Sequence, residues 1–225
     1  MKQNQKFICD EKLKLHIREN LNSFQTSAHL KEGVQQAAVA LAIVDVAHGS
    51  NDYGLPSYAT RQPDAALVLT RRSANLRNHS GQWALPGGRR DSGETSADTA
   101  LRELSEEVGL NLGPDRVLGT LDDFTTRSGF VITPVVVWGG DRVTLVPNPA
   151  EVASIHRIPL TEFLRADAPL IPASPPGIAP LILMPVGNTT IAAPTAAMLY
   201  QFREVALLGK STRVAHYEQP AFAWK

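Results

Sequence analysis

Apolar positions along the chain recur at two different periods, and together they predict a mixture of helices and strands. Residues 10–24 carry leucine and isoleucine side chains spaced among charges, a pattern that indicates an amphipathic helix. Residues 36–46 form a nearly continuous apolar run of strand length, which is typical of a strand buried on both faces. Residues 47–64 are punctuated by Gly, Ser, Asn and Pro, and they are predicted to form a loop.

The rest of the chain continues this alternation. Further strands are predicted at 65–70, 117–121, 130–138, 151–158, 181–186 and 189–192. Helices are predicted from about 95 to 109, as a short helix from Pro159, and from 194 to 208, with Pro194 at a tolerated first-turn position. The pair Gly187-Asn188 between two of the strands indicates a tight hairpin turn.

Composition limits how many domains and which partners the chain can have. At 225 residues and 43% hydrophobic content it can bury one sizeable core, and no segment has the pattern of a second domain. We therefore expect one domain over 1–225, with an N-terminal helix and a C-terminal helix plus tail at about 194–225. Lys and Arg total 22 and Asp and Glu total 22, a balance that argues against a broad nucleic-acid surface and favours a small substrate.

Cysteine use and hydropathy bear on the compartment. Cys9 is the single cysteine, so the chain forms no internal disulfide, and a reducing compartment fits. No apolar run reaches the roughly 18 residues that a membrane-spanning helix needs, and the N-terminus lacks a signal-peptide core. We expect a cytoplasmic protein with no membrane contact.

Four glutamates gather between Gly88 and Leu110, at positions 94, 103, 106 and 107. Because Glu103, Glu106 and Glu107 are three and four residues apart, their side chains share one face of a helix. Three negative charges on one face repel each other. A hard divalent cation such as Mg²⁺ or Mn²⁺ removes that repulsion and takes phosphate oxygens as further ligands. The spacing predicts a metal site for a phosphate-bearing substrate.

Local signals predict where this helix begins and ends. Thr95 or Ser96 can cap its first N–H groups, and Gly109 can end it in a left-handed conformation. Arg102 lies between the carboxylates, and we expect it to pair with Glu94 and to orient the acidic side chains. Taken alone, the helix fits equally well a solvated face with favourable ion pairs.

The flanking residues favour the metal site over the solvated face. Gly88, Glu94, the run Arg102-Glu103-Leu104, the pair Glu106-Glu107 and the pair Gly109-Leu110 match every fixed position of the Nudix box. The chain therefore resembles the Nudix hydrolases. That resemblance implies an α/β fold, an α/β/α sandwich with a mixed sheet and a catalytic loop-helix-loop. It also implies metal-dependent cleavage of a nucleoside diphosphate linked to another group.

The resemblance further implies roles for individual residues. Glu103 and Glu107 would be metal ligands, with Glu106 close to the same cluster. Glu103, Glu106 and Arg102 would belong to the catalytic group. In Nudix relatives a Glu-Val pair commonly opens a strand beside the catalytic helix, and Glu151-Val152 stand in that place. Glu106 and Glu151 are both candidates for the general base, and the alternative for Glu151 is an exposed strand end.

A second motif precedes the box. Thr70-Arg71-Arg72-Ser73, then Arg77, Gly81 and Leu85-Pro86-Gly87-Gly88, resembles the signature of the coenzyme A pyrophosphatase branch, except that Leu85 replaces an aromatic residue. This resemblance implies substrate-binding roles for Arg72, Arg77, Ser73, Gly87 and Gly88. Guanidinium groups match phosphate oxygens, and coenzyme A carries a pyrophosphate and a 3'-phosphate. Arginines at a strand end are otherwise commonly just solvated.

We therefore expect metal-assisted hydrolysis of a pyrophosphate, which would convert coenzyme A into 3',5'-ADP and 4'-phosphopantetheine. Two alternatives stay open. The substrate can be another nucleotide, such as a nucleoside triphosphate, ADP-ribose or a dinucleotide. The chain can also be a non-catalytic module that binds a nucleotide. The sequence leaves homodimer formation open, and the tail with His216 and Tyr217 can either cover the core or meet another subunit.

Overall fold

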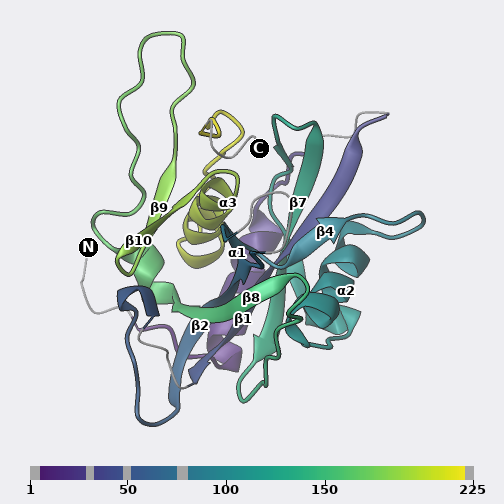
Figure 1. Cartoon of the computed structure of the whole chain (residues 1–225), viewed down its shortest axis with the longest axis vertical. Helices are drawn as coiled ribbons and strands as arrows, with labels where there is room; N and C mark the ends of the chain where they lie inside the picture. The colour runs from purple at the N-terminus through teal and green to yellow at the C-terminus, as the bar shows by residue number, and fades with distance from the viewer. Residues whose placement is uncertain (1–5, 29–32, 48–51, 75–80, 221–225) are drawn as a thin grey trace.

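A mixed β-sheet of eight strands forms the centre of the molecule, with hydrogen-bonded order β3-β2-β1-β7-β5 (Figure 1). The strands are β1 (Gln35–Ala47), β2 (Gln62–Arg72), β3 (Trp83–Ala84), β4 (Gly87–Arg89), β5 (Val117–Thr120), β6 (Phe124–Thr125), β7 (Phe130–Gly140) and β8 (Val152–Pro159). Strands β1 and β7 run parallel, and the other pairs in this sheet are antiparallel. The structure is a computed structural model, and it describes residues 6–28, 33–47, 52–74 and 81–220.

Strand β1 divides the core into two layers because its side chains alternate between the faces of the sheet. Ala38, Ala40, Ala42 and Val44 point into a cluster with the helix α2 (Ser96–Val108). Leu41 and its neighbours of the same parity point into a larger cluster on the opposite face. The apolar run of β1 is therefore buried on both faces, as the sequence predicts.

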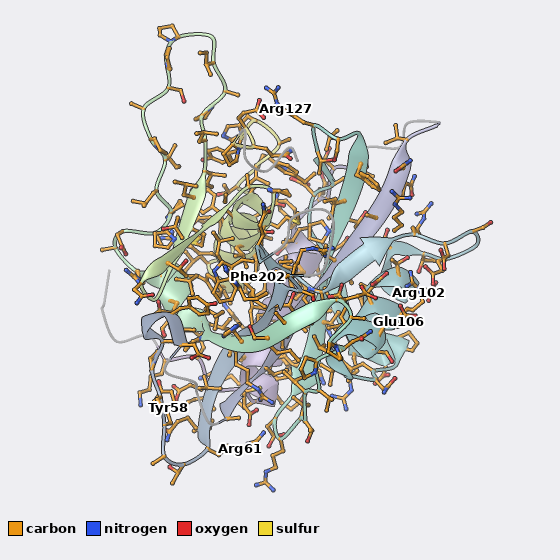
Figure 2. The ribbon with its side chains drawn as sticks, viewed as in Figure 1. Tyr58, Arg61, Arg102, Glu106, Arg127 and Phe202 are labelled. Atoms are coloured by element: carbon orange, nitrogen blue, oxygen red, sulfur yellow. The ribbon has the colours of Figure 1, made fainter. Side chains whose placement is uncertain are left out.

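Two helices cover the face opposite α2. These are α1 (Glu11–Ser23), capped at Asp10, and α3 (Thr195–Phe202), which continues as one π-helical turn, η4 (Arg203–Leu207). Phe202 is fully buried between α3 and the sheet (Figure 2). One helix on one face and two on the other give the expected α/β/α sandwich with a mixed sheet.

A small second sheet lies beside α3. It is the hairpin of β9 (Leu183–Val186) and β10 (Thr189–Ala192), joined at the predicted Gly187-Asn188 turn. The short helix η3 (Leu160–Leu164) follows β8 directly, and the segment between η3 and β9 projects from the body as a long loop (Figure 1).

Several predicted boundaries are wrong, and each error has a physical cause. Strand β2 begins at Gln62, inside the predicted loop, because β1 and β8 pair along it, and a short helix η1 (Asp52–Gly54) also lies in that segment. Strands β3, β4 and β6 are two or three residues long, so they carry no periodic signal. The helix η2 (Pro114–Arg116) is equally short. The predicted helix over 194–208 changes to π geometry after Phe202.

Among the described residues, no helix is long and apolar enough to cross a membrane.

Candidate active site

The site is built where β4 meets the helix α2. Thr95 caps α2 in a reciprocal pair with Asp98, and Gly109 ends it with φ of 69°, so both predicted helix ends are confirmed. Gly88 lies against the Glu103 carboxylate: a Cβ atom at position 88 would stand 2.2 Å from Glu103 Oε1. Glycine at this position therefore leaves the space that the carboxylate occupies.

Gly87 is required for a different contact. A Cβ atom there would lie 2.5 Å from the Ala38 carbonyl oxygen and 2.7 Å from Val39 Cα, both in the backbone of β1. The backbone N–H of Gly87 also hydrogen-bonds the Glu107 carboxylate. This glycine lets β4 approach β1 closely, and β4 in turn contacts α2.

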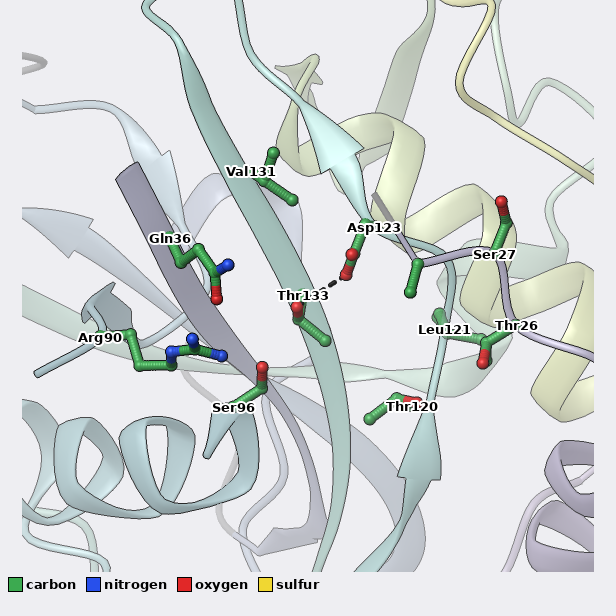
Figure 3. A pocket seen from close by; sticks show the side chains of 11 residues that line it. Thr26, Ser27, Gln36, Arg90, Ser96, Thr120, Leu121, Asp123, Val131 and Thr133 are labelled. Carbon is green, nitrogen blue, oxygen red and sulfur yellow. Dashed lines mark hydrogen bonds between the residues drawn. The ribbon is translucent and has the colours of Figure 1, made fainter. Parts of the chain in front are cut away.

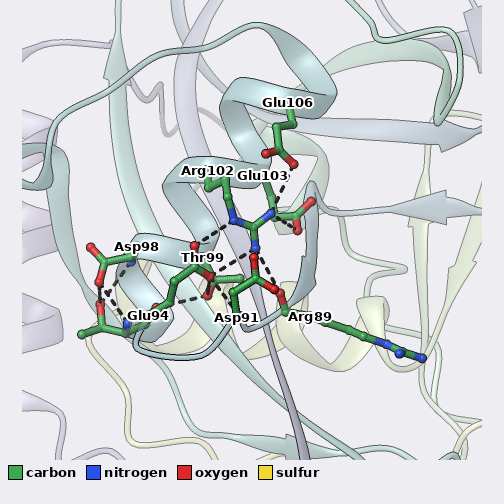
Figure 4. Close-up of polar contacts among 9 residues, drawn as sticks. Arg89, Asp91, Glu94, Asp98, Thr99, Arg102, Glu103 and Glu106 are labelled. Atoms are coloured by element: carbon green, nitrogen blue, oxygen red, sulfur yellow. Dashed lines mark hydrogen bonds and ion pairs between the residues drawn. The ribbon is translucent and has the colours of Figure 1, made fainter.

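Arg102 contacts several carboxylates in a polar network on the outer face of α2 (Figure 4). Its Nε donates to Glu94 Oε1 at 2.8 Å, and its Nη1 donates to Glu103 Oε1 at 2.8 Å and to Glu106 Oε2 at 3.2 Å. Nη2 donates to the Arg89 carbonyl oxygen at 3.0 Å, which ties α2 to β4. The predicted pair of Arg102 with Glu94 is confirmed, and hydrogen bonds from Arg102 and Thr99 lower the pKa of Glu94 to about 2.

Glu103 and Glu107 lie on the inner side of α2 and are both buried, with exposed fractions of 8% and 3%. Burial raises the pKa of Glu107 to about 8, and the charges of Glu103 and Glu151 add to this effect. Burial also raises the pKa of Glu103, although Arg102 opposes the shift, and the Glu106 and Glu151 charges reinforce it. These carboxylates are thus held close enough to destabilise each other's charged form.

A divalent cation would relieve this repulsion, and carboxylate oxygens are the ligands it prefers. In the described part of the chain, however, no three or more His, Cys, Asp or Glu side chains are arranged to hold a metal ion. The guanidinium of Arg102 instead bridges Glu103 and Glu106, whose side chain is 53% exposed. The donor chemistry fits a cation at Glu103 and Glu107. Bringing in Glu106 requires its side chain to leave Arg102.

The second motif supplies the facing side of the site. Arg72 is the last residue of β2, its charge lowers the pKa of Glu107, and its buried Nε has no hydrogen-bond partner in the described structure. The N–H of Ser73 donates to the carbonyl oxygen of Glu151 at 2.7 Å, which fixes Glu151 immediately before β8. The predicted strand beside the helix is confirmed from Val152 onward, and Glu151 itself belongs to the turn that precedes it. Arg77 lies outside the described residues.

A cavity of about 290 Å³ lies next to this cluster, and its wall includes Gly88, the glycine that lies against Glu103. Arg72 and Gly87 also line it, whereas the glutamates of α2 do not. Apolar side chains from β1, β3 and β7 form most of its surface, and Arg89 places its guanidinium carbon 5.1 Å from the centroid of the Phe130 ring. An unpartnered guanidinium N–H in the wall of a mostly apolar cavity is an arrangement suited to a phosphate with an attached organic group.

Some residues that line this cavity were not predicted from the sequence. Arg89 follows the motif glycines without any pattern of its own, and Gln219 comes from the far end of the chain. Leu85, the one departure from the second motif, is 4% exposed in the core, so this position packs against the interior. Tyr217 packs against the same core beside Tyr200, so this part of the tail covers the core.

A second cavity of about 220 Å³ lies on the other side of β7 (Figure 3). Arg90, Ser96 and Asp123 are among its lining residues, and Thr133 donates to Asp123 at 2.7 Å. It does not include the glutamates of α2.

The fold and the carboxylate helix together define a Nudix protein. The NUDIX domain model matches residues 57–178, more than half of the chain, so the chain belongs to this family.

Relatives and solved structures agree with that assignment. The chain is 46% identical over 105 residues to an uncharacterized Nudix hydrolase NudL of Yersinia enterocolitica, covering 46% of this chain and 54% of the relative. It is 45% identical over 104 residues to the NudL protein of Photorhabdus laumondii, covering 46% and 56%. The chain thus spans about half the length of these relatives. A MutT/nudix family protein from Enterococcus faecalis shares the fold, with a TM-score of 0.52, 17% identity and coverage of 87% and 73%.

Proposed function

We propose that this protein hydrolyses the diphosphate of a nucleoside diphosphate derivative, with coenzyme A or a coenzyme A derivative as substrate and Mg²⁺ or Mn²⁺ as cofactor. One observation carries the proposal: the buried carboxylates of Glu103 and Glu107 repel each other, and Glu103 lies against Gly88, which lines a cavity together with Arg72 and its unpartnered Nε–H. A cation would neutralise the carboxylates, and a phosphate would accept the hydrogen bond that the arginine N–H has to offer.

Each side chain has a task that follows from its position. Glu103 and Glu107 would hold the cation, joined by Glu106 once its side chain leaves Arg102. When bound, the cation neutralises charge on the diphosphate and lowers the pKa of the attacking water. Arg72 would bind a phosphate oxygen through its free Nε–H. Arg102 and Glu94 would position Glu103 without touching the substrate.

The proton of the attacking water needs an acceptor. Glu151 directly precedes β8, which contacts α2, and its charge raises the pKa of both Glu103 and Glu107. Its backbone is held by hydrogen bonds with Ser73 and Asn148. Glu106 is on the same helix but more exposed. We favour Glu151 as the general base, because no ion pair holds its carboxylate within the described part of the chain, whereas Glu106 is paired with Arg102.

The choice of coenzyme A rests on the second motif. Ser73, Gly87 and Gly88 belong to this motif, and all three stand at the site: Ser73 fixes Glu151, and the two glycines line the cavity beside Arg72. Arg77, which would add a second guanidinium, is the further residue that this proposal needs.

The test is hydrolysis of coenzyme A, ADP-ribose and a nucleoside triphosphate in oxygen-18 water, with Mg²⁺ or with EDTA, and with product masses recorded. We expect Mg²⁺-dependent release of 3',5'-ADP and 4'-phosphopantetheine. Glu107→Gln should abolish turnover, whereas Glu19→Gln, a matched change of an exposed glutamate on α1, should not.

The outcomes separate the two levels of the proposal. Turnover of ADP-ribose but not of coenzyme A would reject the coenzyme A substrate and keep the metal-dependent hydrolase. Equal turnover in EDTA, or full activity of Glu107→Gln, would reject the metal site itself.

A further inference from the structure

A smaller cavity of about 180 Å³, here called the Arg71 cavity, adjoins the cavity that Arg72 lines. Four residues line both cavities: Gln82, Trp83, Pro194 and Thr195. Among the described residues that line the Arg71 cavity, Arg71 is the charged one, and none is an Asp or Glu. The charge of its lining therefore favours an anion over a cation.

Aromatic rings hold the Arg71 side chain in place. Its guanidinium carbon lies 5.1 Å from the centroid of the Trp83 ring and 5.3 Å from the centroid of the Tyr53 ring. Arg71 and Trp83 stand directly opposite each other where β2 pairs with β3, so their side chains share one face of the sheet. Tyr53 and Trp83 also pack against each other, with ring centroids 5.0 Å apart. The cation is therefore positioned by cation–π contacts.

The N–H groups of Arg71 stay available for a ligand. A cation–π contact does not use the N–H donors as a hydrogen bond does. Within the described part of the chain, the Arg71 side chain forms no ion pair or hydrogen bond, and it is partly exposed. Because the rings already restrict this side chain, it loses less conformational entropy on binding than a free surface arginine would.

The start of α3 adds a weaker attraction for an anion. Thr195, the first residue of α3, and Pro194 before it line the Arg71 cavity, and no side chain caps this helix end. The first N–H groups of a helix carry partial positive charge. This charge has the same sign as that of Arg71, so both favour the same class of ligand.

Arg71 and Arg72 are consecutive residues, yet they line different cavities. Their Cα atoms are about 3.8 Å apart, as in any trans-linked pair. A ligand that binds both arginines therefore needs two phosphate groups a short distance apart. A ribose with a 5'-diphosphate and a separate 3'-phosphate has this arrangement, because one sugar ring carries both groups.

We propose that Arg71 binds a phosphate monoester separate from the diphosphate at Arg72, namely the 3'-phosphate of a nucleotide. A phosphate monoester carries more than one negative charge at neutral pH, and its oxygens accept hydrogen bonds from a guanidinium in a matching geometry. This inference rests on the proposed function, since it assigns a further group of the same substrate to a neighbouring cavity. The selected substrates are then nucleoside diphosphate derivatives with a 3'-phosphate.

The test is calorimetric titration with 3',5'-ADP and with 5'-AMP, which differ only in the 3'-phosphate, in the presence of Mg²⁺. The wild-type protein should bind 3',5'-ADP about tenfold more tightly, the size of one hydrogen-bonded contact between charged groups. Arg71→Met keeps the length of the side chain and removes its charge, so it should abolish this preference. Arg71→Lys keeps the charge and should retain part of it. Arg142→Met, a matched change of an exposed arginine beyond the end of β7, should leave it intact.

Equal binding of the two nucleotides by the wild type would overturn the proposal, and this comparison needs no variant. An unchanged preference in Arg71→Met, shown to be folded by thermal melting, would overturn it as well. Mg²⁺-dependent hydrolysis of coenzyme A and of dephospho-coenzyme A, which lacks the 3'-phosphate, separates the two claims. If both are cleaved with the same kcat/KM, the role of Arg71 is wrong and the hydrolase stands. If the preference for 3',5'-ADP depends on Arg71 but no diphosphate is cleaved, the phosphate site stands and the proposed hydrolysis is wrong.

Discussion

Gly88→Ala should remove activity while leaving the fold intact, because the new methyl group meets only the end of a side chain. Its Cβ would stand 2.2 Å from Glu103 Oε1 and 2.6 Å from Glu103 Cδ. Carbon and oxygen atoms need roughly 3.5 Å. The Glu103 carboxylate must therefore move by about 1 Å, away from its place beside Glu107.

This displacement sets the size of the effect. A misplacement of about 1 Å in a catalytic group costs on the order of 10²-fold in rate, or about 2.7 kcal/mol of transition-state stabilisation. The stability cost should stay within about 1 kcal/mol, because the change strains no left-handed backbone and disturbs one partly exposed ion pair. Gly87→Ala differs, because its methyl group would meet the backbone of β1 at 2.5 and 2.7 Å, and it should lose about 1–3 kcal/mol or more of folding stability.

The assay combines turnover of the diphosphate substrate with urea unfolding of both variants. We expect Gly88→Ala to unfold near the wild-type midpoint with strongly reduced kcat, and Gly87→Ala to unfold at lower urea. Full activity in Gly88→Ala would refute the idea that the Glu103 carboxylate must occupy its observed place. Equal destabilisation of the two variants would refute the distinction between side-chain and backbone contacts.

Three further predictions concern ionisable groups. In the metal-free protein, Glu107→Gln should raise the free energy of unfolding by about 1–3 kcal/mol at pH 8 and by much less at pH 5. The reason is that the pKa of Glu107 rises from 4.5 in the unfolded chain to about 8 in the folded one, so the charge of this carboxylate destabilises the fold above pH 4.5. Urea unfolding in EDTA measures the difference, and a variant no more stable than the wild type would contradict it. Burial lowers the pKa of His156, so the unfolded chain takes up its proton first and stability should fall as pH drops below 6.5; His156→Gln should flatten that slope in pH-dependent melts. Burial raises the pKa of the Cys9 thiol to about 12, so alkylation at pH 8 should be about 10³-fold slower than in urea; comparable rates in the two conditions would show an accessible thiolate.

Local sequence information was sufficient for the helix at the centre of the site. Thr95 and Gly109 mark its ends, and the three- and four-residue spacing of its glutamates places Glu103 and Glu107 together. The same spacing predicts Glu106 beside these two glutamates, but a helix face is broad. Glu106 lies at the exposed edge of that face, where it forms an ion pair with Arg102, four residues earlier.

Contacts between distant segments were not accessible from local patterns. Strand β4 forms because Gly87 lets it approach Val39, 48 residues earlier in the chain, and a strand of three residues has no periodic pattern of its own. Gln219 reaches the cavity through pairing of Glu218 with Arg127 and Pro180, and none of these residues stands out in the sequence. The periodic helices and strands and the helix caps depend on neighbouring residues in the chain, whereas the wall of the cavity depends on tertiary contacts.

The central claim is that the α2 carboxylates hold a divalent cation for a diphosphate. Crystals soaked in Mn²⁺ with a non-hydrolysable coenzyme A analogue test it most directly, through anomalous diffraction. We predict a peak about 2.2 Å from carboxylate oxygens of Glu103 and Glu107, with a phosphate oxygen completing the coordination. No peak near these two residues, with Glu103 still paired to Arg102 and the analogue bound, would contradict the claim.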